Sequence, residues 1–250
     1  MDKEWMRSIK SFRKEIMTIG YLDLLGMSEA IMNQPIDEVA DKYISTFIAE
    51  KASHLFAGGE ELIGEATHLK YVQFSDSSLF IGGANNEKDV RMTVYIISGM
   101  MGCLLNNWGI VARGAISIGE FCTIEEFNTY VGKPLVEAAL IESVTDWVGL
   151  TFLMPKPERP ELLAELEKYH WLSNLQVPIK AGKEDRLLEK GISQDRLIPV
   201  RWFIGEDPQH SKKLALKLKE LISNARDKNV QKKLENGLSF IQNSLREGNG

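Results

Sequence analysis

The sequence has little cysteine and no long apolar run. Cys103 and Cys122 lack the spacing of a zinc site or of a disulfide framework, and we interpret both as buried free thiols. The longest nearly uninterrupted apolar run, Thr93 to Leu105, is shorter than the roughly 20 residues that a membrane span needs. No signal-peptide pattern opens the chain, so we expect a cytoplasmic protein without a membrane span.

An excess of positive charge is also absent. The 30 Lys and Arg residues against 35 Asp and Glu give a net charge of −5, which argues against a nucleic-acid-binding protein. Hydrophobic residues make up 44% and charged residues 26%, as in ordinary globular domains. With 250 residues, the chain is long enough for one large domain with an appendage, and we place the boundary between residues 1–207 and a helical extension over 208–250.

Hydrophobic periodicity predicts strands that alternate with helices. Pro35 is expected to interrupt the first helix, residues 181–195 to form a polar loop, and Leu135, Ala139 and either Ile141 or Leu140 to face the core. The expected strands are 16–25, 68–74, 78–81, 110–121, 148–154, 177–179 and 197–204, and the expected helices are 28–58, 87–107, 133–145, 161–172 and one or two after residue 208. This order favours an α/β sandwich with a mixed, partly antiparallel sheet.

Two aspartates interrupt or follow apolar strands. Asp23 stands at the end of the first strand, before a glycine turn, and Asp76 stands at the tip of the early hairpin. Burying a carboxylate there costs free energy, because it loses hydration, unless a cation compensates for the loss. A hard divalent cation that carries a phosphate is a common solution. Two such aspartates on neighbouring strand ends can hold two metal ions over one substrate. The alternative is that each is only a turn or capping residue.

Four segments in order carry a resemblance to a family. Residues 23–28, DLLGMS, resemble the D-[IV]-x-G-[FM]-[ST] segment of class III nucleotidyl cyclase catalytic domains. FSDS at 74–77, RGAISIGE at 113–120 and GKPLVEAALIE at 132–142 resemble the family's hairpin, following strand and following helix. The resemblance covers residues 16–146, and its wording is most similar to the pyrimidine cyclases of bacterial anti-phage signalling.

This resemblance implies a fold and an activity. The fold would be a ferredoxin-type βαββαβ core, with a mainly antiparallel sheet, within residues 1–207. The activity would be conversion of a nucleoside triphosphate, UTP or CTP, to a 3′,5′-cyclic monophosphate and pyrophosphate, with two Mg²⁺ or Mn²⁺ ions per site. The enzyme would be a homodimer, and its product would act on a cyclic-nucleotide-responsive effector in antiviral defence.

The resemblance also assigns roles to residues. Asp23 and Asp76, with the backbone of Leu24, would hold the metals, and Arg113 would point at phosphate, brace the dimer or form an ordinary ion pair. Lys70 and Thr129 would read the base, although Lys70 is equally well explained as a solvated edge-strand lysine. The phosphate-binding residues that the resemblance implies are Leu24, Leu25, Gly26, Met27, Ser28, Lys180 and Lys183.

One departure from the family stands in the last motif. Active class III cyclases carry an Asn and, four residues later, an Arg that stabilise the transition state, whereas this chain has Val136 and Leu140. Either another cation such as Arg113 or Lys133 replaces them, or the alignment is displaced, or catalysis is lost. The competing hypotheses are therefore a catalytically degenerate nucleotide-binding sensor or interaction protein, and a polymerase-like palm domain that makes another product.

Overall fold

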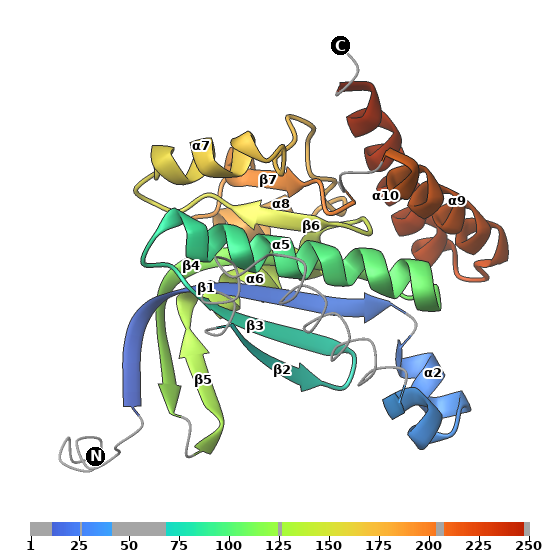
Figure 1. The fold of residues 1–250 in the computed structure, drawn as a ribbon, viewed down its shortest axis with the longest axis horizontal. Helices are drawn as coiled ribbons and strands as arrows, with labels where there is room; N and C mark the ends of the chain where they lie inside the picture. Colours follow the sequence, from blue (N-terminus) through green and yellow to red (C-terminus); the bar gives the residue numbers. More distant parts are fainter. Residues whose placement is uncertain (1–11, 26, 42–68, 125–126, 204–207, 248–250) are drawn as a thin grey trace.

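The computed structural model describes residues 12–25, 27–41, 69–124, 127–203 and 208–247, and Figure 1 shows their arrangement. The strands are β1 (Phe12–Leu25), β2 (Lys70–Phe74), β3 (Ser77–Gly83), β4 (Val111–Ile124), β5 (Thr129–Gly132), β6 (Leu150–Leu153) and β7 (Leu197–Val200). The helices are α2 (Met27–Asn33), α5 (Glu87–Cys103), α6 (Lys133–Val144), α7 (Pro160–Lys168), α8 (Glu184–Leu188), α9 (Pro208–Asn224) and α10 (Lys228–Glu247).

The strands form one mixed sheet in the order β2-β3-β1-β4-β6-β7, and β5 pairs with the far end of β4. Among the strand pairs of the described residues, only the pairing of β4 with β6 is parallel. The first four strands and their intervening helices give the split βαβ arrangement of ferredoxin-like folds, with the order β2-β3-β1-β4. The predicted α/β class, mixed sheet and βαββαβ core are confirmed.

Helix α5 covers one face of this sheet. Gly20 of β1 lets the helix approach closely, because a Cβ atom there would lie 2.2 Å from the Ile97 side chain. Leu22 and Leu24 lie on the same face of β1 as Gly20, because residues two apart in a strand point the same way. Both belong to the main hydrophobic cluster, as does Ile97. A π-helical segment, Leu104–Trp108, prolongs α5 before Gly109 ends it at φ 65°, which confirms the predicted helix over 87–107.

Helix α6 covers the opposite face. Ile19 of β1 points away from α5 and forms a second, smaller cluster with Phe121 of β4, against which Leu135 of α6 packs. The expected core face of α6 was partly wrong, since Leu135, Ala139 and Leu140 are only half-buried. The buried positions of α6 are Pro134, Glu137, Ala138, Ile141, Glu142 and Val144. Two of these are acids, because Ser117 and Arg113 on β4 offer them polar partners.

Several boundaries differ from the expectation. Strand β1 starts four residues earlier than predicted, and β5 was not predicted at all. Residues 177–179 contribute only an isolated bridge from Ile179 to Thr145, because the chain there runs past the sheet without joining it. The expected polar loop contains the short helix α8, since Leu187 is a buried anchor within it. Cys103 and Cys122 are free, but half-buried rather than buried.

Pro35 does separate two helical stretches, α2 and residues 36–41. The rest of the predicted first helix, from residue 42 on, lies outside the described residues, as does Gly26.

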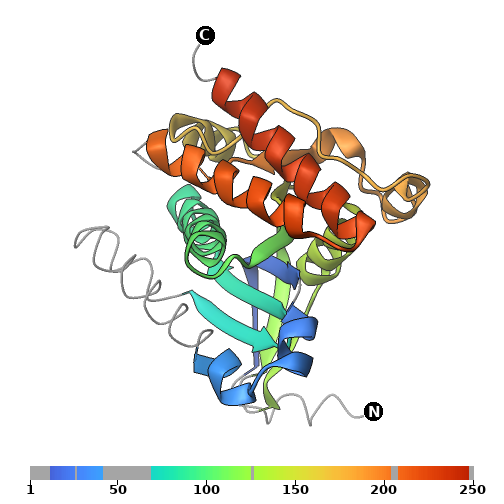
Figure 2. The ribbon, with the colours of Figure 1, turned by 90° about the vertical axis from the view of Figure 1, so that its right-hand side faces the viewer.

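Helices α9 and α10 pack side by side against the rest of the fold, as Figure 2 shows. Both helices contribute to the main hydrophobic cluster, α9 through Leu214 and Leu218 and α10 through Leu234, Phe240 and Ile241. A domain boundary at residue 207 stays a prediction. Within the described residues, no helix combines the length and the apolar character that crossing a lipid bilayer requires.

Candidate active site

The end of β1 and the turn between β2 and β3 meet at one end of the sheet (Figure 1). Asp23 is paired in register with Ser77 of β3 and with Arg113 of β4. The N–H of Leu24 donates a hydrogen bond of 2.8 Å to the carbonyl of Asp76. The structure therefore brings the two candidate metal-binding aspartates from distant parts of the sequence to the same strand ends.

The hairpin turn is held by local polar contacts. Ser75 adopts the left-handed conformation, with φ 52°, as tight turns require. The Gln73 side chain donates from Nε2 to the Ser75 carbonyl at 2.6 Å, and its Oε1 accepts from the Ser78 hydroxyl at 2.7 Å. These contacts fix the backbone that carries Asp76.

Arg113 bridges two acids at the start of β4. Its Nε and Nη2 atoms both lie 3.0 Å from Oδ2 of Asp23, and Nη2 lies 2.5 Å from Oε1 of Glu142 on α6. The three side chains are 12%, 20% and 9% exposed, respectively, so these are largely buried interactions. Of the alternatives for Arg113, the structure shows an ion pair; a part in phosphate binding or in bracing a dimer stays a prediction.

Two lysines complete this charged cluster. Lys180 donates from Nζ to the Ser143 carbonyl at 2.5 Å, and Lys233 of α10 interacts electrostatically with Asp23, Glu142 and Arg113. Burial, followed by the charge of Arg113, lowers the pKa of both lysines. Burial also raises the pKa of Glu142 to about 7, although Arg113 opposes the change.

Lys233 was missed by sequence reasoning. It stands on an amphipathic helix after the segments that resemble the cyclase family, and its spacing is that of an ordinary surface lysine. Only the packing of α10 brings it to the Asp23 end of the sheet, so no sequence signal could have identified it.

The predicted phosphate-binding segment lies where β1 passes into α2. Leu24 and Met27 are buried, so these two residues could contact a ligand only through their backbone, whereas Leu25 is half-buried. Gly26 and the side chain of Ser28 lie outside what the structure describes. Lys183, the second lysine predicted to bind phosphate, is exposed at the start of α8, where its N–H donates to the Lys180 carbonyl at 3.0 Å.

The structure brings together the two elements expected to read the base. Lys70 on β2 places its ammonium 5.0 Å from the centre of the Tyr130 ring, a cation–π contact. Tyr130 follows Thr129 on β5, and the Thr129 hydroxyl donates to the Phe127 carbonyl at 3.2 Å. Lys70 is half-buried and lies on β2, an edge strand of the sheet, so its part in base recognition stays a prediction.

The two positions at which an Asn and an Arg were expected differ in exposure. Val136 is 62% exposed, whereas Leu140 is half-buried and packs against the main hydrophobic cluster. Lys133, one suggested replacement, pairs with Glu137 at 3.4 Å. It precedes Glu142 by nine residues, about 13 Å along the helix, and so stands well away from Arg113.

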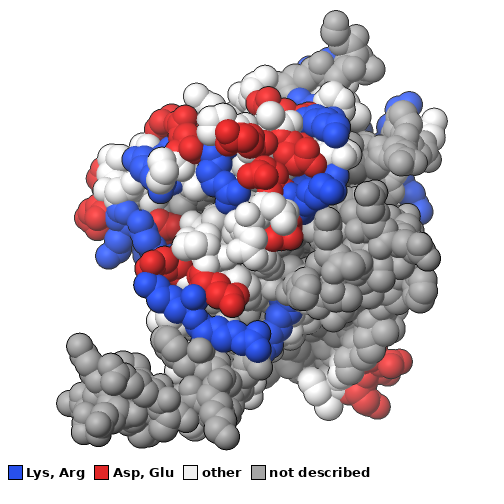
Figure 3. Space-filling view, turned by 60° about the vertical axis from the view of Figure 1, so that its left-hand side comes forward, with Lys and Arg blue, Asp and Glu red and all other residues white. Residues whose placement is uncertain are grey.

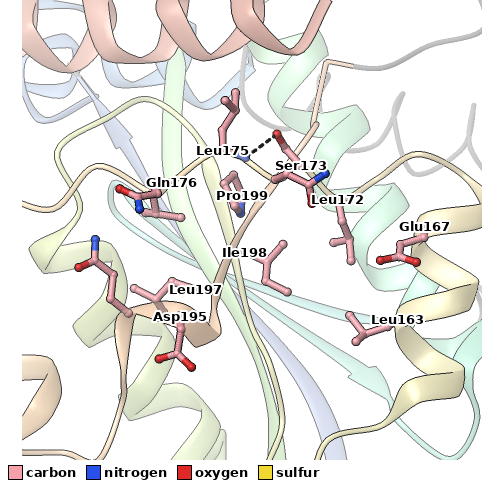
Figure 4. Close-up of a pocket in the computed structure, with 13 residues that line it drawn as sticks. Leu163, Glu167, Leu172, Ser173, Leu175, Gln176, Asp195, Leu197, Ile198 and Pro199 are labelled. Carbon is pink, nitrogen blue, oxygen red and sulfur yellow. Dashed lines mark hydrogen bonds between the residues drawn. The ribbon is translucent and has the colours of Figure 1, made fainter. Parts of the chain in front are cut away.

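A separate cavity of about 450 Å³ lies between α7 and β7 (Figure 4). Glu167, Leu172, Asp195 and Ile198 are among its lining residues, and none of Asp23, Asp76 and Arg113 is. Within the described residues there is no group of three or more His, Cys, Asp or Glu side chains that could hold a metal ion.

No protein-family model and no curated protein matches the chain. Among solved structures, the adenylyl cyclase CyaB from P. aeruginosa is 14% identical, with a TM-score of 0.48, over 76% of this chain and 93% of that one. The guanylate cyclase domain of RhGC from Catenaria anguillulae, in complex with GTP, is 12% identical, with a TM-score of 0.49, over 75% and 96%. Since these values are low, the function must be argued from the residues of this chain.

Proposed function

We propose that this protein is a metal-dependent nucleotide cyclase that converts a nucleoside triphosphate to a 3′,5′-cyclic monophosphate and pyrophosphate. The observation that carries the proposal is the meeting of Asp23 and Asp76 at one end of the sheet, beside the largely buried Arg113 and the half-buried Lys180 and Lys233. Two carboxylates next to cationic side chains suit a substrate that is itself a polyanion bound to metal.

The residues present fit Mg²⁺ or Mn²⁺, two per site. Such hard cations take oxygen ligands, which Asp23, Asp76 and the carbonyl of Leu24 supply. Both contacts from Arg113 go to Oδ2 of Asp23, so we assign Oδ1 as the oxygen that would bind a cation. When bound, the metals would make the 3′-hydroxyl more acidic and neutralise charge on the phosphates.

The protein's own side chains would orient the reaction. Attack of the 3′-oxygen on the α-phosphorus forms the cyclic ester and breaks the bond to pyrophosphate, while the hydroxyl proton leaves to solvent. Arg113 and Lys180 would stabilise the charge that accumulates on the leaving pyrophosphate. Arg113 also holds Asp23 in place, because two of its N–H groups reach the same carboxylate oxygen.

We extend the proposal to the base and the biological role. Lys70 and Thr129 are the residues we assign to base recognition, with UTP or CTP as substrate, and the contact of Lys70 with Tyr130 supports their proximity. The product would act on an effector in antiviral defence. The support for pyrimidine specificity and for this role is the resemblance of the four sequence segments.

A homodimer is part of the proposal. Phe127, Val131 and Val136 are 59%, 61% and 62% exposed, and they lie before, within and after β5, where the chain continues into α6. Exposed apolar side chains on consecutive elements favour contact with another protein surface. A second copy that covers them would also bring its own side chains near α6.

The test incubates the purified protein with Mn²⁺ and each of ATP, GTP, CTP and UTP, and identifies the products by mass. We expect one cyclic monophosphate, with Asp23→Asn and Asp76→Ala each lowering its rate at least about 100-fold, since even partners of metal ligands contribute 10–100-fold. Asp185→Ala, on an exposed aspartate of α8, is the control and should retain the rate.

Other outcomes would overturn the proposal. Cyclisation that survives both substitutions would show that the two aspartates are not the metal ligands. Triphosphate binding without any product would select the sensor hypothesis, which Val136 and Leu140 favour. Linear or dinucleotide products would instead identify a palm-like polymerase.

A further inference from the structure

Cations from distant parts of the chain gather around Arg113. On the face shown in Figure 3, acidic and basic side chains are interspersed, as the small net charge implies. The cluster holds four cations, Arg113, Lys180, Lys232 and Lys233, beside the acids Asp23, Glu142 and Asp146. Asp76 lies on the adjoining turn. The cations therefore come together where both candidate metal-binding aspartates lie.

Helix α10 is firmly attached beside this cluster. The carbonyl of Lys233 accepts a hydrogen bond of 3.1 Å from the N–H of Val148, and Asn236 donates to the Asp146 carbonyl at 2.5 Å. Gly237 permits the contact, since a Cβ atom there would lie 2.7 Å from the Val148 carbonyl oxygen. The position of Lys233 is thus set by backbone contacts and not by a mobile side chain alone.

The same segment connects α10 to Arg113. Trp147 packs edge-on against Phe240 of α10, with ring centres 4.8 Å apart, and neither ring is appreciably exposed. Two residues later, the carbonyl of Gly149 accepts a hydrogen bond of 2.9 Å from the N–H of Gly114. Gly114 directly follows Arg113, so α10 and the arginine are held by one short, continuous segment.

The mutual repulsion of these cations points to an anionic ligand. Among the charged groups, Arg113 has the largest effect on the pKa of both Lys180 and Lys233, and Lys233 also lowers the pKa of Lys180. Partly buried like charges are unfavourable unless an anion lies between them. A polyphosphate carries several negative charges and hydrogen-bond acceptors, so it suits a group of cations from three elements better than a single carboxylate does.

We propose that Lys233 of α10 binds phosphate, and that with Lys180 and Arg113 it forms a cradle for the terminal phosphates of a nucleoside triphosphate. This inference rests on the proposed function and adds to it a residue from outside the segments that resemble the cyclase family. Lys233 supplies positive charge to a site in which Val136 and Leu140 supply none. The helical extension is therefore part of the active site.

The experiment measures binding of inorganic tripolyphosphate by calorimetry in metal-free buffer. Lys233→Met keeps the length of the side chain and removes its charge, and it should weaken binding about ten-fold or more, since hydrogen bonds to charged groups are the strong ones. Lys233→Arg should restore most of the affinity. Lys228→Met, an exposed lysine on the same helix, is the matched control and should bind as the wild type does. Lys180→Met should repeat the loss.

The outcomes separate this inference from the proposed function. Unchanged tripolyphosphate binding in Lys233→Met, or no binding by the wild type, overturns the phosphate cradle. If the wild type forms no cyclic product but binds tripolyphosphate through Lys233, the cyclase proposal fails and the cradle stands. If it forms a cyclic product and Lys233→Met leaves KM unchanged, the cyclase stands and the cradle fails. Thermal unfolding of each variant confirms that it is folded.

Discussion

The two faces of the sheet are built differently. On the α5 face, the buried side chains of the helix include no charged group, and Ile97 reaches down onto Gly20 of β1. On the α6 face, two of the six buried residues of the helix are the acids Glu137 and Glu142. The difference teaches that the α5 face is an ordinary apolar core, whereas the α6 face keeps charged groups buried beside the strand ends that carry both aspartates.

This division has a physical cost. Burying a charge removes its hydration, and an ion pair inside a protein often returns less free energy than well-packed apolar side chains would. The Arg113, Asp23 and Glu142 cluster is therefore a poor choice for stability alone. Its presence at the strand ends that carry both aspartates favours a functional reason. The following predictions test this contrast.

The largest effect is expected on the α5 face. Phe80 on β3 is fully buried, and its ring centre lies 5.1 Å from that of Tyr71. Phe80→Ala should lower the free energy of unfolding by about 3–5 kcal/mol, because it leaves a cavity in a close-packed cluster. Urea unfolding measures the loss. Tripolyphosphate affinity below the midpoint should not change, and a large loss of affinity would show that the two faces are not independent.

A smaller effect is expected on the α6 face, and it depends on pH. The pKa of Glu142 is raised from its ordinary value of 4.5 to about 7 in the folded protein. The protonated acid therefore favours folding below pH 4.5, and this contribution, on the order of 3 kcal/mol, is lost as the pH rises through 7. Urea unfolding of the metal-free protein between pH 4.5 and 8 should show the decline.

Glu142→Gln should flatten that pH dependence, because it removes the titrating group while keeping its size. Glu137→Gln changes the other buried acid of the same helix, which accepts a hydrogen bond from Ser117, and should retain the dependence that Glu142 causes. Equal slopes for the wild type and Glu142→Gln would contradict the assignment.

The smallest effect is expected at Lys133, on the same helix but away from the cluster. Its side chain is 78% exposed and pairs with Glu137 across one helical turn. Lys133→Met should change the free energy of unfolding by less than about 0.5 kcal/mol, since exposed ion pairs contribute little. Calorimetry with tripolyphosphate should give the wild-type affinity. A marked loss would mean that Lys133 serves as the replacement cation after all.

The sequence predicted the parts of the fold whose patterns are regular. Strand β1, the β2-β3 hairpin and α5 combine apolar periodicity with clear turn residues, and all three are present, although β1 begins four residues earlier than expected. The buried face of α6 was misplaced because periodicity treats Glu142 as a surface residue, whereas Arg113 makes its burial tolerable. Helix α8 was missed because a single buried leucine, Leu187, anchors it among polar neighbours.

In the candidate site, local sequence patterns predicted the residues that lie on strands or at their ends. Asp23, Asp76 and Arg113 follow from strand ends and motif order, and the structure places them on adjoining elements. Lys233 could not be found this way, because its position depends on how α10 packs against residues 146–148. Side chains that enter a site from a distant helix leave no local trace in the sequence.

The sequence distance across the charged cluster has a kinetic consequence. Asp23 and Arg113 are 90 positions apart, and so are Asp146 and Asn236, the contact that fastens α10. Closing such long loops is entropically unfavourable early in folding, so local units such as the hairpin and α5 form first. We expect substitutions in the cluster to speed unfolding more than they slow folding. Competence to hold a polyphosphate would then be the last property that the folding chain acquires.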